Sequence, residues 1–502
     1  MRSQANTAPV LQSATTLYGD GQPIWLEHDR WNNHKRQKIE EFVLGATHGG
    51  QQISGRVLNF RLTARERAMK FVGPAAAAIL LFGVQTGAAA ADCRIPDYTE
   101  QYPIPTGHES DPRFKLSVAF PTQLPKQRQP WEGLSFDSEW QKYLSAALDK
   151  ALSELDDDLL PKNVAGKTEW FHVPWMDGGP RGREYSHGLT KERGPDPQDI
   201  SENPQLPGKQ GWAVGVYNAV AGYTLGKVFA SPCDPDLSKA LFEPGAATVK
   251  FLFTDATPAE IPWLAGTLKW SAHINPATGG NSRTLRDVYL IQVDVGVRDP
   301  NASETGWVFG TFVFDSGSPS KPPAKWRDGL VPLSIQWGND PNANADDPKT
   351  QTHVNAATPT KHFGWAARKT LGWYGRANGP IDNIISSCLS CHGSAQFPRS
   401  AKYSNFWDKR KYPNMTDDER RKIWFKAVKP GELFDSSQSG SIPLDYSLQL
   451  QTAMEHFCGG VGKTITPPPA SCQSFAQILS TLSPAEAAEA MMPTTRGDTE
   501  AQ

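Results

Sequence analysis

The sequence predicts an α+β protein in which an antiparallel, β-rich, sandwich-like domain is followed by a small, mainly helical domain. Between residues 165 and 340, several short segments rich in Val, Phe, Tyr and Thr show two-residue alternation, and no helical pattern separates them. Strands that follow one another at short intervals favour antiparallel pairing. One amphipathic helix is expected before this region, and two are expected near the C-terminal end.

The helix before the β-rich region should begin at Asp137 or Ser138, because either side chain can cap a helix. Apolar residues then recur at three- and four-residue spacing, so they share one helix face. They are Trp140, Tyr143, Leu144, Leu148, Ala151, Leu152 and Leu155. We expect this face to lie against a core.

The clearest predicted strand is 288–297. Its alternation places one set of side chains on one face, namely Tyr289, Ile291, Val293, Val295 and Val297. Gln292 and Asp294 should point to the opposite face. The other predicted strands cover 211–230, 247–254, 266–274, 307–314 and 330–337.

Two helices are predicted toward the C-terminus. Thr416 and Glu419 have the spacing of a capping box, and the helix that they begin should end before Pro430. The second helix should cover 445–457, with Tyr446, Leu450, Met454 and Phe457 on one side.

The segment before the first of these helices reads Cys388-Leu389-Ser390-Cys391-His392, a Cys-x-x-Cys-His run that is the attachment signature of a c-type haem. Two thiols three positions apart lie on one side of a helical turn and can form thioethers to the two vinyl groups of one porphyrin. The next residue, His392, is then placed to ligate the iron. A redox dithiol or half of a zinc site is the alternative.

An export signal precedes the predicted domains. Met69 and Lys70 give a basic start, residues 71–91 are uncharged and mainly apolar, and the run ends in Ala88–Ala91. We expect translation to start at Met69, residues 1–68 to be an upstream misreading, and 69–91 to be a cleaved signal peptide. A long basic leader and an uncleaved anchor are the alternatives.

The expected compartment is the periplasm, because covalent haem is attached on the far side of the bacterial membrane. Paired cysteines oxidise there. With the haem pair removed, Cys93, Cys233, Cys458 and Cys472 remain, and they allow three connectivities. Our hypothesis pairs Cys93 with Cys233 and Cys458 with Cys472.

The expected organisation follows from these segments. It comprises the extension 1–68, the signal peptide 69–91, an entry segment and helix 92–160, a β-rich domain 161–350, a linker 351–380, a haem domain 381–483 and a flexible tail 484–502. A glycine-punctuated loop at 171–194 holds Trp175, Met176, Arg183, Glu184 and His187. We expect a solvated surface loop there, with a ligand-binding or haem-facing site as the alternative.

Through its exported N-terminus, the motif Cys388-x-x-Cys391-His392 and the helices that follow, the chain resembles the bacterial periplasmic c-type cytochromes over roughly residues 375–480. The resemblance implies a cytochrome c-like fold for the haem domain, thioethers at Cys388 and Cys391 and His392 as the proximal ligand. It also implies a distal methionine, for which Met415 and Met454 are the candidates. A five-coordinate iron, or a ligand such as His353 or His362, is the alternative.

Three functions compete. One-electron transfer by a single covalent haem c, with a periplasmic or membrane redox partner, is the expected one. A haem-dependent oxidoreductase or gas sensor with an open distal site over a β-domain pocket is the second, because the chain is far longer than electron transfer requires. A ligand-binding protein with a regulatory or structural haem is the third.

Charge argues against two classes of partner. Residues 1–70 hold ten Lys and Arg and six Asp and Glu, so that the remainder of a chain with a net charge of −2 is mildly acidic. Such a surface is poorly suited to nucleic acid or anionic lipid. We therefore expect no nucleic-acid partner, and no membrane span once the signal peptide is cleaved.

Overall fold

The structure is a computed structural model. It describes residues 93–98, 104–164, 166–176, 182–195, 197–201, 203, 205–274, 283–342, 351–354, 372–384, 386–400 and 414–481. These residues belong to one compact unit, Thr86–Gln502. The predicted upstream extension, signal peptide and tail lie outside the described residues, as does most of the predicted linker.

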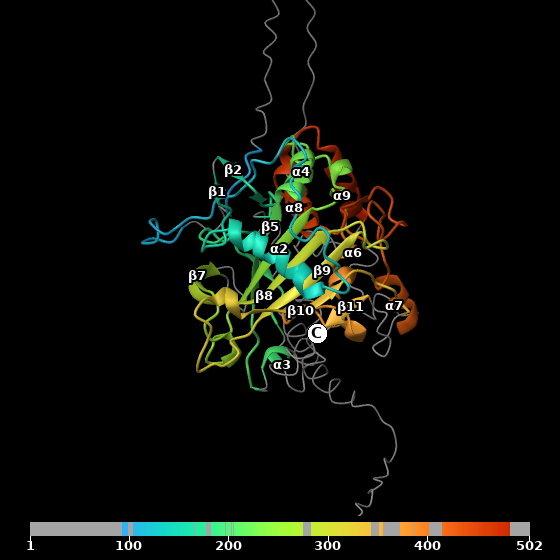
Figure 1. The fold of residues 1–502 in the computed structure, drawn as a ribbon. Helices are drawn as coiled ribbons and strands as arrows, with labels where there is room; N and C mark the ends of the chain where they lie inside the picture. Colours follow the sequence, from blue (N-terminus) through green and yellow to red (C-terminus); the bar gives the residue numbers. More distant parts are fainter. Residues whose placement is uncertain are drawn as a thin grey trace, which may run out of the picture. The chain divides into compact units, whose positions relative to one another are not determined.

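A nine-stranded antiparallel sheet dominates the described residues (Figure 1). Its main path runs β11-β10-β9-β8-β6-β5-β3, while β4 also pairs with β5 and β7 with β8. The strands are β3 (Trp170–Phe171), β4 (Thr190–Glu192), β5 (Gly211–Asn218), β6 (Ala247–Thr254), β7 (Lys269–Ile274), β8 (Thr284–Arg298), β9 (Trp307–Phe314), β10 (Leu330–Gln336) and β11 (Thr352–Val354). Two small sheets pair β1 (Asn163–Val164) with β2 (Lys167–Thr168) and β12 (Gln396–Phe397) with β13 (Ile442–Pro443).

Helices cover the large sheet. The α-helices are α2 (Trp140–Glu154), α3 (Pro197–Ile200), α4 (Ala219–Val228), α6 (Cys388–Gly393), α7 (Asp417–Trp424), α8 (Leu448–Gly459) and α9 (Ala470–Thr481). Short 3-10 turns occupy Leu237–Lys239, Pro262–Leu264, Trp326–Gly329, Trp373–Gly375 and Val461–Thr464. The α+β prediction is thus confirmed. In the described residues, helices rather than a second large sheet pack against the nine-stranded sheet, so the arrangement differs from a sandwich.

One face of the sheet packs against α2, which lies across the strands in Figure 1. The predicted apolar face of this helix is buried there, including Tyr143, Leu148 and Leu152. Its partners include Val293 and Val295 of β8. The helix begins at Trp140, slightly later than expected, and its N-cap residue Glu139 makes no side-chain capping bond.

The other face carries a second apolar cluster, called here the α8 cluster. It joins Trp307 and Phe309 of β9 to α4, to Leu389 of α6 and to Met454 and Phe457 of α8. The segment that contains the Cys-x-x-Cys-His motif therefore shares a core with the sheet.

Two strand predictions were wrong in part. Strand β5 ends at Asn218, whose side chain accepts a hydrogen bond from the Ala221 backbone and caps α4, so the second half of the predicted strand 211–230 is helical. In β8 the pairing with β6 shifts register between Leu252 and Phe253. This bulge moves Ile291 off the face of Val293 and into a separate cluster, because one extra residue reverses the alternation.

The approach of α2 to the sheet depends on Gly310 of β9. A Cβ atom there would lie 2.4 Å from a methyl carbon of Leu144. We expect Gly310→Ala to lower the free energy of unfolding by about 1 to 3 kcal/mol through overpacking. Urea denaturation would measure this loss. In a Leu144→Ala background, Gly310→Ala should lower the free energy of unfolding by less, because the methyl carbons that the new Cβ atom meets are gone. An equal loss of stability in both backgrounds would contradict this contact.

Both predicted cysteine pairs are formed. Disulfides join Cys93 to Cys233 and Cys458 to Cys472, with Cα atoms 5.3 and 5.2 Å apart. The second bridge connects α8 to α9, a helix that periodicity did not predict. No helix among the described residues is long and apolar enough to span a membrane.

Candidate functional site

The Cys-x-x-Cys-His motif forms the short helix α6. Ser387 caps it by accepting a hydrogen bond from the Ser390 backbone N–H at 3.2 Å, and the Cys388 N–H donates to the carbonyl of Ala377 at 3.0 Å. Cys388 and Cys391 therefore lie three positions apart on one turn, as thioether attachment requires. Neither residue is in a disulfide, although the other four cysteines are.

The sulfur of Cys391 lies 2.9 Å from the hydroxyl oxygen of Ser386. That oxygen accepts a hydrogen bond from the indole N–H of Trp424 at 3.1 Å, which leaves the hydroxyl hydrogen available to the sulfur. A sulfur that accepts a hydrogen bond is held in one rotamer. Trp424 comes from α7, so this predicted helix positions one of the two thiols.

The ring of His392 is held in one orientation. Its Nδ1 atom lies 2.9 Å from the carbonyl oxygen of Tyr446. A carbonyl oxygen can only accept, so Nδ1 carries the hydrogen and a neutral ring keeps its lone pair on Nε2. The ring of Phe309 stacks on the imidazole, with centroids 4.3 Å apart. A histidine that donates Nδ1–H to a carbonyl is arranged as metal-ligating histidines are.

The Tyr446 carbonyl is presented by an unusual turn. Asp445 and Tyr446 both have positive φ, 44° and 68°, which is uncommon for two successive residues with side chains. The buried Asp445 carboxylate accepts hydrogen bonds from the indole N–H of Trp307 at 3.0 Å and the backbone N–H of Phe242 at 2.9 Å. Burial raises the pKa of Asp445, while these bonds oppose the rise.

The Tyr446 side chain holds the same turn from its other side. Its hydroxyl donates to the carbonyl of Val428 at 2.6 Å, and the ring packs against Gly393 at the end of α6. The turn that orients His392 is thus fixed to the sheet by Asp445 and to the chain just after α7 by Tyr446.

Beneath the motif, the sheet carries a polar row. One residue from each of the neighbouring strands β5, β6, β8, β9 and β10 lies directly opposite the next, so that they form a line across the sheet. The polar residues are Lys250, Asp294, Thr311 and Ser334, and Gly215 of β5 pairs with Lys250 at the end of the row. Apolar clusters lie on both sides of this row, since Phe309 belongs to one and Val313 to another.

Two carboxylates meet at this row. The side-chain amide of Gln292 donates to Asp294 and to Asp382, both at 2.8 Å. Burial, followed by repulsion from Asp382, raises the pKa of Asp294 to about 7. Burial also raises the pKa of Asp382. For the Cys388 thiol, burial and then the carboxylates of Asp382 and Asp294 raise the pKa, so this sulfur is a neutral thiol at neutral pH.

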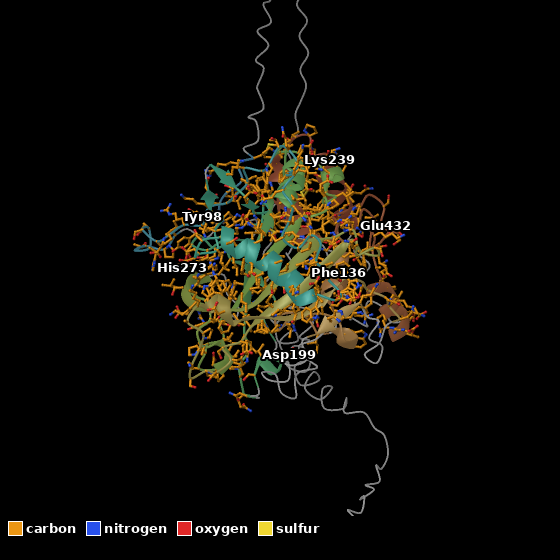
Figure 2. All side chains as sticks on the ribbon, viewed as in Figure 1. Tyr98, Phe136, Asp199, Lys239, His273 and Glu432 are labelled. Atoms are coloured by element: carbon orange, nitrogen blue, oxygen red, sulfur yellow. A yellow bond between two sulfur atoms is a disulfide. The ribbon has the colours of Figure 1, made fainter. Side chains whose placement is uncertain are left out.

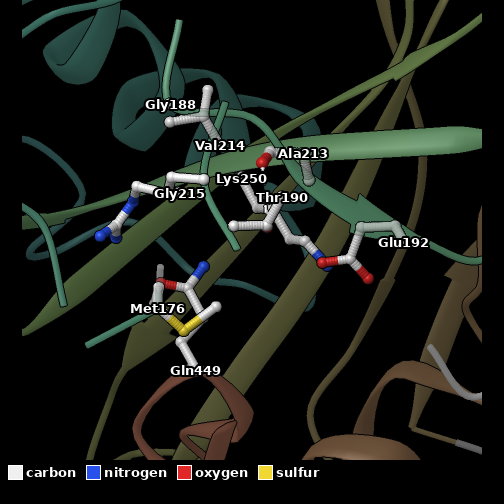
Figure 3. Close-up of a pocket in the computed structure, with 10 residues that line it drawn as sticks. Met176, Gly188, Thr190, Glu192, Ala213, Val214, Gly215, Lys250 and Gln449 are labelled. Carbon is white, nitrogen blue, oxygen red and sulfur yellow. Dashed lines mark hydrogen bonds and ion pairs between the residues drawn. The ribbon is translucent and has the colours of Figure 1, made fainter. Parts of the chain in front are cut away.

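A narrow pocket opens beside the row (Figure 3). The ammonium of Lys250 lies 3.0 Å from the carboxylate of Glu192, and the two point toward one another in Figure 3. Met176 and Gln449 line the same pocket. Sequence reasoning did not single out Lys250, because an isolated lysine in an alternating strand gives no signal of its neighbours.

The loop 171–194 is buried in part, and the expectation of a solvated surface loop was wrong for these residues. Arg183 and Glu184 are buried, and the Trp175 ring packs against that of Phe457 of α8 in a tilted arrangement, with centroids 5.1 Å apart. The Trp175 carbonyl also accepts from Nδ1 of His456 at 3.1 Å. The loop therefore packs against the segment that follows the motif.

The distal candidates lie in different surroundings. Met454 is fully buried in the α8 cluster, and Met415 is half-buried just before α7, where its carbonyl accepts from Arg420. His353 pairs with Asp137 at 2.6 Å, and His362 lies outside the described residues. The choice of a sixth ligand stays a prediction.

Comparison of the chain with family models, curated proteins and solved structures found no match.

Proposed function

We propose that the chain is an exported mono-haem c-type cytochrome that transfers single electrons in the periplasm. The observation that carries the proposal is the Nδ1–H bond from His392 to the Tyr446 carbonyl, beside two thiols on one helical turn. This donor set fits a haem: Cys388 and Cys391 would bond the porphyrin, and Nε2 of His392 would ligate the iron. The bound group would supply a one-electron couple within a small, mainly helical, cytochrome c-like segment.

Export is part of the same proposal. Two disulfides accompany two cysteines that are not disulfide-bonded, which is the distribution expected when an oxidising compartment pairs every cysteine except those reserved for a cofactor. The redox partner would then be a periplasmic or membrane protein. In this proposal the large sheet would act as a rigid support for α6. Electron transfer does not require the second sheet of a sandwich.

The alternative is a haem-dependent oxidoreductase or gas sensor with an open distal site. The pocket lined by Met176, Lys250 and Gln449 beside the polar row favours it. A ferrous spectrum with and without carbon monoxide separates the two functions. A large shift at moderate carbon monoxide would favour the alternative, whereas an unchanged spectrum would favour electron transfer.

The central test is covalent attachment. Expression in a host equipped for cytochrome maturation should give a coloured protein whose mass exceeds that of the processed chain by one haem. The variant Cys388→Ser/Cys391→Ser should lose that added mass completely, because both thioethers are removed. Mass spectrometry of the denatured protein measures this directly.

The matched control is Cys458→Ser/Cys472→Ser, which also removes two cysteines of the same region. It should be less stable but keep the covalent haem. A colourless wild-type protein from a host that matures other cytochromes would overturn the proposal.

A further inference from the structure

Three potential metal ligands meet at the end of the sheet away from the motif. His108, Asp111 and His273 each offer one ligand atom, and these atoms lie within 4.8 Å of one another. In Figures 1 and 2, His273 on β7 and the helix α6 lie on opposite sides of the view. The group is therefore separate from the proposed haem site.

The strongest evidence is the unsatisfied ring of His273. The residue is 3% exposed, and neither ring nitrogen has a hydrogen-bond partner among the residues that the structure describes. Buried polar atoms are rarely left unpaired, because an unpaired group keeps its full desolvation cost. A ligand that accepts the lone pair of one nitrogen would remove part of this cost.

The fold holds the three side chains in place. Nδ1 of His108 lies 2.8 Å from the Asp111 carboxylate, and the rings of His108 and His273 meet edge to face with centroids 4.8 Å apart. The buried carboxylate of Glu184 accepts from the backbone N–H of His273 at 3.2 Å. This bond fixes the strand end that carries the unpaired ring.

The remaining neighbours complete an aromatic and polar wall. The centroid of the Tyr185 ring lies 4.9 Å from that of His273, and its buried hydroxyl has no hydrogen-bond partner in the described part of the chain. Arg283 is the nearby cation, and its guanidinium donates to the carbonyls of Gly182 and Arg183.

We propose that His108, Asp111 and His273 bind a divalent transition-metal ion of the zinc class. Two imidazoles and one carboxylate suit Zn²⁺. Calcium and magnesium prefer oxygen ligands, so this ligand set does not favour either of them. Tetrahedral bonds of about 2.0 to 2.1 Å place ligand atoms about 3.4 Å apart, so small side-chain rotations would close the present spacing. Three protein ligands leave a fourth position for water.

The test uses the exported, haem-loaded protein, treated with a chelator and dialysed. Calorimetric titration with Zn²⁺ should show one site, and Co²⁺ should compete with Zn²⁺ for that site. Asp111→Asn and His273→Gln should each weaken Zn²⁺ binding by at least about 100-fold, since even changes around a ligand cost 10- to 100-fold. Asp111 is partly exposed, so its substitution leaves folding intact.

His353→Gln is the matched control. It removes a histidine that also pairs with an aspartate, and its pair is not in the one three-ligand group found among the described residues. Zn²⁺ affinity should be unchanged in this variant. An absence of Zn²⁺ binding by the wild type would overturn the proposal. So would binding that survives His273→Gln and disappears in Cys388→Ser/Cys391→Ser, because the metal would then occupy the cysteine motif.

Discussion

Replacing Asp445 by Ala is expected to lower the free energy of unfolding by about 3 to 5 kcal/mol. The substitution leaves the buried N–H groups of Trp307 and Phe242 without an acceptor, at about 1 to 3 kcal/mol each. It also removes the carboxylate 3.8 Å from the partly buried Arg298 side chain, and it places alanine at a positive φ that aspartate tolerates better.

The same variant should disturb His392. Without Asp445 the turn is free to relax, and the Tyr446 carbonyl loses its fixed position below Nδ1. In the haem-loaded protein, loss of the Nδ1–H bond makes the ligand less basic, so the midpoint potential should become more positive. Potentiometric titration measures this change, and urea denaturation measures the stability.

Asp236→Ala is the control for Asp445→Ala. Asp236 is a half-exposed carboxylate that caps the short turn Leu237–Lys239, so its loss should cost about 1 kcal/mol or less and leave the potential unchanged. An Asp445→Ala protein as stable as this control would show that the turn does not depend on its carboxylate.

The second large effect concerns pH. The pKa of Asp294 is about 7 in the folded protein, well above its ordinary value of 3.8. A raised carboxyl pKa means that folding favours the protonated form, so the stability that Asp294 contributes is complete below pH 3.8 and is lost as pH rises through 7. At 1.36 kcal/mol per pKa unit, the loss approaches about 4 kcal/mol.

Asp294→Asn should remove this dependence. Asparagine keeps an oxygen that can accept from Thr311 and Gln292 but carries no charge, so the variant should be more stable than wild type at pH 8 and not at pH 4. The readout is the difference in unfolding free energy between variant and wild type across that range. A difference is needed because buried His456, with a pKa of about 4, adds stability as pH rises from 4 to 6.5.

Asp287→Asn is the matched control on the same strand. Hydrogen bonds from Ser271 and Lys269 lower the pKa of Asp287, so its stabilisation is present above pH 3.8 and is lost as pH falls. Its removal should not stabilise the protein at pH 8. A pH-independent difference for Asp294→Asn would contradict the carboxylate pair.

The sequence alone determined the elements whose signals are local. Strands β6 and β9 lie where alternation predicted them, and the capping box of Thr416 and Glu419 begins α7. The disulfide pairing was also predicted, from an even count of cysteines and a short loop. Such features depend on residues near one another in the chain, or on a covalent bond with few possible partners.

Tertiary structure decided what the motif rests on. Asp294 and Asp382 are 88 positions apart, and nothing in either local sequence signals that Gln292 bridges them. The Ile291 bulge reversed part of a predicted face, and the left-handed turn at Asp445 lies where periodicity predicted helix. The Cys-x-x-Cys-His spacing predicts covalent haem attachment from the sequence alone, because the spacing is a property of one helical turn. The carbonyl that orients His392, the charges beneath Cys388 and the ligand group around His273 arise only when tertiary packing brings turns, loops and strands that are distant in the sequence together.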